Sequence, residues 1–569
     1  MVRTRKTLLL LLLISSLGCT TSPQFADSVF LNGKIYAGNV ENAWVQSVAI
    51  RDGRFIYVGD NPSDLVGPAT QTYDLGNKLV IPGLIDGHTH PGLVALTHDQ
   101  LLLDDASNKD ELMAAIKKMV DENPDRSEII GGFWENEIFD AFGPNKKDLD
   151  EIESERPLIL YDAWAHTVWA NSAALKQANV TKDTPDLVPG FAFYQKNETG
   201  EPTGWITESA ASVFMNNFLK ITPEVEVVLK EYLDYFRSVG VTTVFDAGNF
   251  GLDREVYGAV ARLDKRGLLP VRYHGSYTLY VPNDYEDAIK RLKQLGADFN
   301  SENVRIDTLK VFFDGVLETR TAAISNDYLD TPGNSGEALL NQEQIRDLVL
   351  ALDEENLNLH VHAVGDRAVT TVLDGIESAH QSLGRVPKIR MAICHLEVVK
   401  VTDFPRFKKL NVVGNFTPHW WVGGEASWVE KGIGDAVNQM QRAQSLISDG
   451  ALVTFSSDNT SVYEWQTQRS DPFLGMQMGH NRQDIGVPAN GPVMPPLSDR
   501  VPRADLVNGY TGNAAYQLGR SDELGTIAVG HRADLLVLNQ NLFEVDRYDI
   551  HKTKPQAVIV DGVLVSGSL

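Results

Sequence analysis

The sequence predicts an α/β fold built on a (β/α)₈ barrel, with a large insertion after the first barrel strand and a small β-sandwich formed by both chain ends. Three observations support this prediction: eight short apolar segments of strand type, helical segments between most of them, and strand-and-turn patterns at both termini. The length of 569 residues suits one large domain with a smaller one. A hydrophobic content of 43 % and a charged content of 22 % are typical of a globular protein.

The eight predicted barrel strands are short runs of apolar and β-branched residues. They are residues 82–87, 241–246, 270–276, 306–312, 357–362, 390–395, 411–416 and 451–457. Helix-like segments separate most of them, for example 225–238, 284–295, 342–355 and 437–448. Strand and helix alternating eight times favour a closed parallel barrel, here residues 81–520. Because the first gap is much longer than the others, we interpret residues 91–240 as an insertion at the catalytic face.

The two ends of the chain show a different pattern. Residues 28–80 and 521–569 alternate apolar and polar side chains around Asn-Gly and Asp-Gly turns, as β-hairpins do. We expect both ends to pair in one small β-sandwich, an expectation that also draws on the family resemblance described below.

Residues 1–19 have the order of a secretory signal: basic residues, an apolar run from Leu8 to Ile14, then small residues before Cys19. The run is too short to span a bilayer. Ser16 to Cys19 resemble a bacterial lipoprotein cleavage site, and the alternative is an ordinary cleaved signal. We expect an exported protein, held on the periplasmic side of a bacterial membrane by lipid on Cys19. The second cysteine, Cys394, leaves no basis for a disulfide framework.

The formal net charge of -25 argues against nucleic acid and against anionic membranes as partners. We therefore expect membrane contact through the lipid alone and a small-molecule substrate as the partner. The sequence leaves the oligomeric state open.

Side chains able to bind metal end several of the predicted strands. His88 and His90 have one residue between them, so they project from the same side of the first strand. The carboxyl end of the strands is where barrels of this type perform chemistry, and two neutral imidazoles can chelate one cation. Four later strands add further candidates: Lys310, His362, His395 and Asp458.

Each of these residues also has a plain structural interpretation. Lys310 is compatible with a buried salt bridge, His395 with core packing and Asp458 with a helix cap. The coincidence of all of them at the predicted strand ends favours a metal centre.

The set resembles the amidohydrolase superfamily. The motifs KVFFDGVLETRTA, HAVGDRAV, ICHLE, YTGNAAYQLG and GTIAVGHRADLLVL are similar to its family 3 branch, which contains N-substituted formamide deformylases. The resemblance runs from about residue 28 to the C-terminus. It implies that His88, His90 and Asp458 hold one divalent ion and that His362 and His395 hold a second. An ammonium group would repel these ions, so the resemblance implies a CO₂-derived carbamate on Lys310. One metal beside an unmodified Lys310 is the alternative.

The chemistry that follows is hydrolysis by metal-activated hydroxide of a C–N bond, other than a peptide bond, in a small amide-type molecule. Zn²⁺ suits the ligand mixture best, and a bound divalent ion lowers the pKa of water from 15.7 toward about 7. Asp458 would act as general acid and base. The metal and His395 would stabilise the oxyanion.

Other residues are candidates for contact with the substrate. His166, Glu208, Arg320 and His419 could line the pocket; the alternatives are a surface histidine, a solvated glutamate and, for Arg320, pairing with Glu318. Four tryptophans could form an aromatic wall or belong to the core: Trp134, Trp205, Trp420 and Trp421. Cys394 precedes a proposed ligand, so strand alternation predicts that its side chain points away from the site.

Two other functions fit the same residues. One is a mononuclear deaminase, or another hydrolase of the superfamily acting on a cyclic or ester substrate. The other is a binding or regulatory protein that kept the fold and lost turnover. The complete ligand set argues against the latter.

Overall fold

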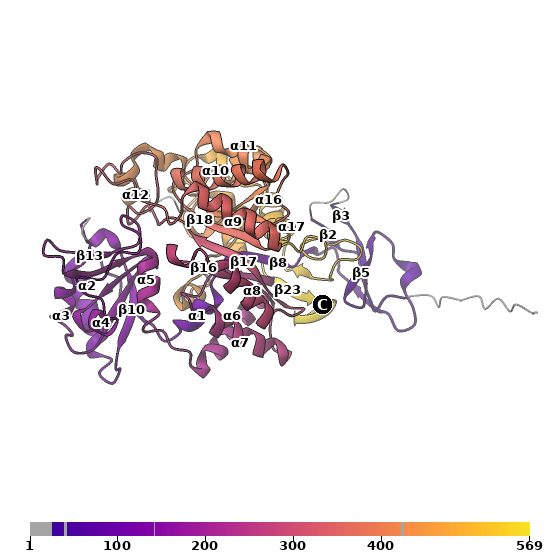
Figure 1. Cartoon of the computed structure of the whole chain (residues 1–569). Coiled ribbons are helices and arrows are strands. Elements are labelled where there is room, and N and C mark those ends of the chain that lie inside the picture. The colour runs from indigo at the N-terminus through magenta and orange to yellow at the C-terminus, as the bar shows by residue number, and fades with distance from the viewer. Residues whose placement is uncertain (1–24, 39–42, 141–142, 423–425) are drawn as a thin grey trace, which may run out of the picture.

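The computed structural model describes residues 25–569 except 39–42, 141–142 and 423–425. The predicted signal peptide, with Cys19, lies outside the described residues. In Figure 1 a central barrel carries the insertion on one side and a sandwich of strands on the other. The predicted fold class is confirmed: the chain forms a parallel eight-stranded barrel with extra sheets, one of them built from both chain ends.

The barrel strands follow one another in chain order, and each paired neighbour is parallel. They are β8 (Leu84–Thr89), β15 (Val241–Asp246), β16 (Arg272–Leu279), β17 (Val304–Phe312), β18 (Asn358–Ala363), β19 (Met391–His395), β20 (Val412–Phe416) and β21 (Val453–Phe455). Two hydrogen bonds join the first strand to the segment after the last: Asp458 N to His88 O at 2.9 Å and His90 N to Asn459 O at 3.1 Å. The barrel is therefore nearly closed by the segments that carry the proposed ligands.

Helices cover the barrel and connect its strands. Their bounds are α1 (Pro91–Leu96), α6 (Pro223–Ser238), α7 (Asp253–Lys265), α8 (Ala288–Phe299), α9 (Gln342–Glu355), α10 (Asp366–Leu383), α11 (Phe404–Leu410), α12 (Ala426–Ile433), α13 (Ala443–Ser448), α14 (Val462–Gln466), α15 (Pro472–Asn481), α16 (Arg503–Gly509) and α17 (Gly512–Gln517). The predicted helix 437–448 is shorter than expected, because Gln441 has a φ of 55° and separates a 3₁₀ turn from α13. Among the described residues, no helix has the length and apolarity to cross a membrane.

Helix α9 illustrates why these segments form helices. The side chain of Asn341 accepts from Gln344 N, and the Gln344 side chain accepts from Asn341 N, so a capping box begins the helix. Ile345, Leu348 and Leu352 recur at helical spacing and are buried.

The insertion forms a separate six-stranded sheet in the order β13-β14-β12-β11-β10-β9. Its strands are β9 (Leu101–Leu102), β10 (Ile129–Trp134), β11 (Leu158–Asp162), β12 (Thr167–Ala170), β13 (Tyr194–Lys196) and β14 (Pro202–Thr207), with helices α2 (Lys109–Asp121), α3 (Lys146–Asp150), α4 (Ser172–Gln177) and α5 (Glu208–Met215). The sheet has its own core, to which Trp134, Trp169 and Trp205 belong. Helix α6 lies within the range predicted as insertion but packs on α1 and β15, so it is part of the barrel's helical layer.

Both ends of the chain meet in the sandwich. One sheet has the order β5-β4-β1-β6 and the other the order β24-β23-β22-β7-β2-β3. The bounds are β1 (Ser28–Leu31), β2 (Lys34–Tyr36), β3 (Trp44–Val45), β4 (Ser47–Arg51), β5 (Arg54–Gly59), β6 (Gln71–Asp74), β7 (Leu79–Pro82), β22 (Leu535–Leu538), β23 (Pro555–Val560) and β24 (Val563–Gly567). The junction is the antiparallel pair β7–β22, in which Leu536 faces Ile81.

A buried ion pair joins the barrel to the sandwich. Arg272, which begins β16, is 3 % exposed and pairs with Asp534, next to β22, and with Asp561 at 2.7 Å. Removing this guanidinium leaves the buried Asp534 carboxylate without its cation, whereas Asp561 keeps its ion pair with Arg532 at 3.0 Å.

We expect Arg272→Ala to lower the free energy of unfolding by about 3–5 kcal/mol, the usual cost of breaking a buried pair. Equilibrium unfolding in urea measures this change in the free energy of unfolding. The control is Arg254→Ala, which removes the ion pair of a 60 % exposed arginine with Asp298 and should cost less than about 1 kcal/mol. Equal effects of the two substitutions would contradict a structural role for the buried pair.

Candidate active site

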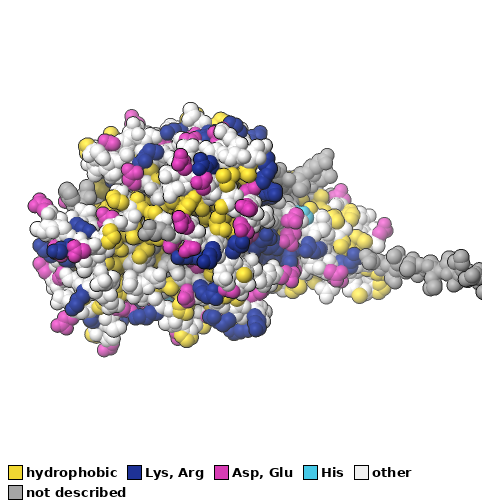
Figure 2. Space-filling model, in the orientation of Figure 1, with side chains coloured by type: hydrophobic (Ala, Val, Ile, Leu, Met, Phe, Trp, Pro, Cys, Tyr) yellow, Lys and Arg dark blue, Asp and Glu magenta, His cyan; other side chains and the backbone are white. Residues whose placement is uncertain are grey.

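A cavity of about 450 Å³ lies at the carboxyl ends of the barrel strands, under the insertion. Of the six predicted metal-binding residues, His395 ends a barrel strand, and His90 and Asp458 follow one. His88 and His362 lie one residue before a strand end, and Lys310 lies within β17. All six line the cavity: His88, His90, Lys310, His362, His395 and Asp458. In Figure 2 charged side chains are dispersed over one face of the molecule, whereas the side chains of this cluster are largely buried.

Asp458 is the centre of the first group. Its Oδ1 lies 3.5 Å from His88 Nε2 and 3.3 Å from His90 Nε2, and its Oδ2 lies 3.4 Å from His395 Nδ1. One donor atom from each of His88, His90 and Asp458 lies within 4.8 Å of the others, a spacing that can hold a metal ion.

His362 and His395 form the second group, with ring centroids 4.4 Å apart. Their Nδ1 atoms are buried and make no hydrogen bond to the described residues, although each lies 3.4 Å from a carboxylate oxygen. Buried polar atoms normally have partners, so these two indicate a ligand such as a cation.

Burial governs the charge of the cluster. The pKa values of four histidines lie well below the usual value: His88, His360, His362 and His395. Burial is the largest cause, and neighbouring positive charges lower these pKa values further. Neutral imidazoles keep a free lone pair on one nitrogen, which is the form that binds metal.

Lys310 lies beneath this cluster and is 2 % exposed. Its Nζ is 3.3 Å from His88 Nε2 and 3.4 Å from Cys394 Sγ. Among the described residues, no carboxylate lies within 4 Å of this amine.

The prediction that Cys394 points away from the site is wrong. Its thiol faces the barrel interior beside Lys310, and burial raises its pKa to about 12. Strand alternation fails here because His395 has a φ of 73° and the chain leaves the extended conformation at that residue.

His360 belongs to the site but was not predicted. Its Nε2 lies 3.0 Å from His88 Nδ1, and Nε2 of His88 is the atom nearer Asp458. The sequence carries a signal for it: His360 and His362 repeat the spacing of His88 and His90. Asp314 was also missed; it accepts from the backbone of Val364 and Gly365 at 3.0 Å, and it lies beside His362.

The insertion contributes His166 and Glu208 to the cavity wall. His166 Nδ1 donates to Glu208 Oε2 at 2.5 Å, and the rings of His166 and His362 are 5.6 Å apart. Burial alone would lower the pKa of His166, but the charge and hydrogen bond of Glu208, together with the charges of Asp162 and Glu318, outweigh it and raise this pKa to about 9.

Strained backbone is concentrated at this cavity. Six of its lining residues are not glycine yet have positive φ: Phe133, Ala165, Glu208, Phe250, His395 and Asp458. Such conformations cost free energy and cluster at functional sites, because surrounding contacts must hold them.

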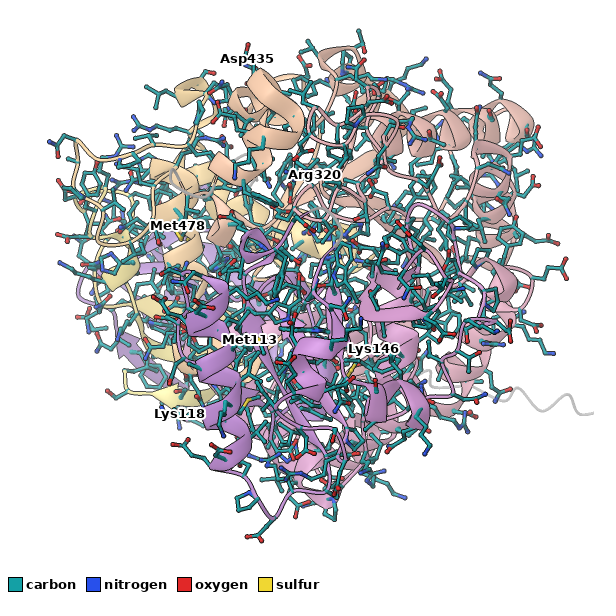
Figure 3. All side chains as sticks on the ribbon, turned by 90° about the vertical axis from the view of Figure 1, so that its left-hand side faces the viewer. Met113, Lys118, Lys146, Arg320, Asp435 and Met478 are labelled. Carbon is teal, nitrogen blue, oxygen red and sulfur yellow. The ribbon has the colours of Figure 1, made fainter. Side chains whose placement is uncertain are left out.

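Arg320 does not line this cavity. Its guanidinium forms an ion pair with Asp330 at 2.7 Å and donates to the backbone oxygens of Leu317 and Trp428. Figure 3 shows it between the insertion, marked by Met113 and Lys146, and the segment of Asp435. Its contacts therefore join the segment after β17 to α12, outside this cavity.

His419 reaches the cavity wall, but its two ring nitrogens face the backbone oxygens of Ser456 and Asp471 at 3.2 and 3.0 Å. Burial lowers its pKa to about 4, so the neutral ring can donate to one of them. Of the four tryptophans, Trp420 lines the cavity and stacks on His395, whereas the other three are buried in cores.

Comparison with known proteins agrees with this geometry. A sequence model of the amidohydrolase family matches residues 71–566. The exoenzymes regulatory protein AepA of Pectobacterium carotovorum is 30 % identical over 77 % of this chain and 95 % of its own. The N-substituted formamide deformylase of Arthrobacter pascens is 25 % identical over 95 % and 98 %.

Among solved structures, an uncharacterised metal-dependent hydrolase from Pyrococcus furiosus covers 91 % of this chain and 100 % of its own, with 24 % identity and a TM-score of 0.65. This likeness supports the fold. The family match extends over most of the chain and includes every residue of the cluster, so the protein belongs to the amidohydrolase family, in its family 3 branch.

Proposed function

We propose that this protein is a metal-dependent amidohydrolase that cleaves a C–N bond, other than a peptide bond, in a small amide-type molecule. The observation that carries the proposal is the cluster of three imidazoles, two of them buried, around the Asp458 carboxylate at the carboxyl end of a barrel.

The residues fit a divalent metal. His88, His90 and Asp458 would hold one ion, and His362 and His395, with their unpartnered Nδ1 atoms, would hold a second. Nitrogen and oxygen donors in this mixture suit Zn²⁺. Such an ion supplies Lewis-acid chemistry, because it lowers the pKa of water to about 7 and polarises a carbonyl oxygen.

Asp458 is the residue placed to move protons. Its carboxylate faces three imidazoles and the cavity, and its backbone N is fixed on His88 O. It would accept a proton from the attacking water at an Oδ atom and transfer it to the leaving nitrogen.

The cavity also fits a small substrate. Aromatic residues from the insertion and from the segments after barrel strands line it, including Phe133, Phe250, Tyr280 and Trp420. The name of the Arthrobacter pascens relative suggests N-substituted formamides as the first substrates to test.

Chelation should abolish hydrolysis, and added Zn²⁺ should restore it. Aryl and alkyl N-substituted formamides are the test panel, with released formate as the readout. His88→Ala should lower kcat/KM by at least about 10³-fold, because a ligand is lost. The control is His98→Ala, whose ring bonds to its own helix and does not line the cavity. Full activity of His88→Ala would exclude the proposed site.

The number of metal ions tests the role of Lys310. We propose a carbamate on this amine, which would help to hold two ions; the burial of the amine without a carboxylate partner supports it. Elemental analysis should then give two Zn²⁺ per chain, native mass spectrometry should detect the added CO₂, and Lys310→Ala should lose at least one ion. One ion and an unmodified lysine would favour the mononuclear deaminase.

We expect His360 to strengthen metal binding by orienting the ring of His88. A partner on the second ring nitrogen fixes the orientation of a ligating histidine, and its loss typically costs about 10–100-fold in metal affinity. We expect His360→Phe to weaken Zn²⁺ binding in this range, as measured by competition with a chromogenic chelator. Unchanged affinity, with the native melting temperature, would show that His360 only fills the barrel.

A regulatory protein without turnover is the second candidate, and the name of the Pectobacterium relative favours it. The intact donor set argues against it, because a site without turnover has no need of buried, unpartnered imidazoles. Protein purified without chelator and found free of metal would support this candidate.

A further inference from the structure

The insertion places one charged pair against the metal-binding cluster, and barrel chemistry does not require this pair. Glu208 is fully enclosed, with a side chain 0 % exposed, whereas its partner His166 is 16 % exposed and lines the cavity. A buried carboxylate is costly unless it is paired and hydrogen-bonded. The Glu208–His166 pair therefore stands at the cavity wall as an ion pair with one member open to a ligand.

Glu208 is held from two sides. Its Oε1 accepts from Thr319 at 3.0 Å and from Thr321, both in the segment after β17, and its Oε2 accepts from His166 Nδ1. Gly315 leaves the space for this contact, since a Cβ there would lie 2.5 Å from Glu208 Oε1. The carboxylate therefore ties the insertion to the barrel and leaves little freedom to the imidazole.

The backbone around the His166–Glu208 pair is strained. Glu208 N donates to His166 O at 2.7 Å, and Glu208 has a φ of 54° although it is not glycine. Ala165, directly before His166, has a φ of 58°. Strain at both positions indicates that the surrounding contacts hold the ring in place at a cost in stability.

With Nδ1 occupied by Glu208, Nε2 is the polar atom that the ring can offer to a ligand. Among the described residues, no hydrogen-bond partner contacts Nε2. An enclosed pair is stable only when it carries no net charge. In a His–Glu pair without net charge Nε2 carries a hydrogen, whether the shared proton lies on Nδ1 or on Oε2, so Nε2 is a donor.

The position of the ring relative to the cluster decides what it can contact. His166 packs on Phe312 and on His362, and His362 packs on His395, which in turn faces Asp458. His362 and His395 thus connect His166 to Asp458 by successive contacts, and all four residues line the cavity. A carbonyl group bound over the cluster would share this cavity with the proton-transfer residue and with the imidazole.

We propose that His166, positioned by Glu208, is a catalytic residue whose Nε2–H donates a hydrogen bond to the oxygen of the scissile carbonyl group as negative charge develops there. The inference rests on the proposed amide hydrolysis and adds a donor that comes from the insertion and not from the barrel. No proton is transferred in this step: one hydrogen bond forms, and Glu208 keeps its own. A fixed donor aimed at developing charge is worth more in the transition state than in the bound substrate.

Binding of two probes tests the role without turnover. Phenylphosphonate carries tetrahedral anionic oxygens, and benzamide is a neutral amide of similar size. We expect Glu208→Gln and the double variant His166→Gln/Glu208→Gln to weaken phenylphosphonate binding by about 10-fold or more, because a charge-assisted hydrogen bond is lost. Benzamide affinity should stay within about 2-fold. The double variant replaces the ion pair by two neutral amides, so it avoids an uncompensated buried charge.

The control is His98→Ala, which alters a histidine outside the cavity and should leave both affinities unchanged. Calorimetry is run on Zn²⁺-loaded and on metal-free protein, and the variants should lose phenylphosphonate affinity in both. If formamides prove to be substrates, the same variants should lower kcat and leave KM near the native value.

Native phenylphosphonate affinity in the double variant would overturn the proposal, as would an equal loss for both probes. No binding of phenylphosphonate to the native protein would overturn it as well. If that binding depends on His166 but no amide is hydrolysed, the proposed function fails and the anion-binding role of His166 stands.

Discussion

The hydrogen bond from Asp458 N to His88 O is the contact on which the rest of the site depends. It joins the first barrel strand to the segment after the last, so the same contact that nearly closes the barrel sets the two residues side by side. Asp86 reinforces the junction by accepting from the backbone of His88 and of Ser457 at 3.2 Å. An open sheet of the same strands would leave the first and last members apart, and no cluster would form.

Nearly closing the barrel has an electrostatic consequence. The ring of strand ends encloses several imidazoles, a lysine and one carboxylate away from water, and burial keeps the imidazoles neutral. The unpartnered ring nitrogens of His362 and His395 are a cost that a bound cation would remove. Stability and metal binding are therefore linked, since the residues that weaken the empty site are those that would hold the ion.

The insertion completes the cavity. The barrel supplies the metal-binding cluster, and the extra sheet supplies His166, Glu208 and Phe133. Three of the strained positions lie on this insertion. In barrels the active-site face is built from the loops after the strands, so a relative with a different insertion could keep the same cluster and act on a different substrate.

The sequence by itself determined the fold class and the six residues of the cluster, because strand periodicity and the carboxyl-end rule need no tertiary information. The same reasoning applies to the second H-x-H pair, His360 and His362, although His360 was not predicted to belong to the site. The direction of Cys394, the structural roles of Arg320 and His419 and the pairing of His166 with Glu208 were decided by tertiary structure alone. Each depends on a positive φ or on a partner far away in the chain, and neither can be read from local spacing.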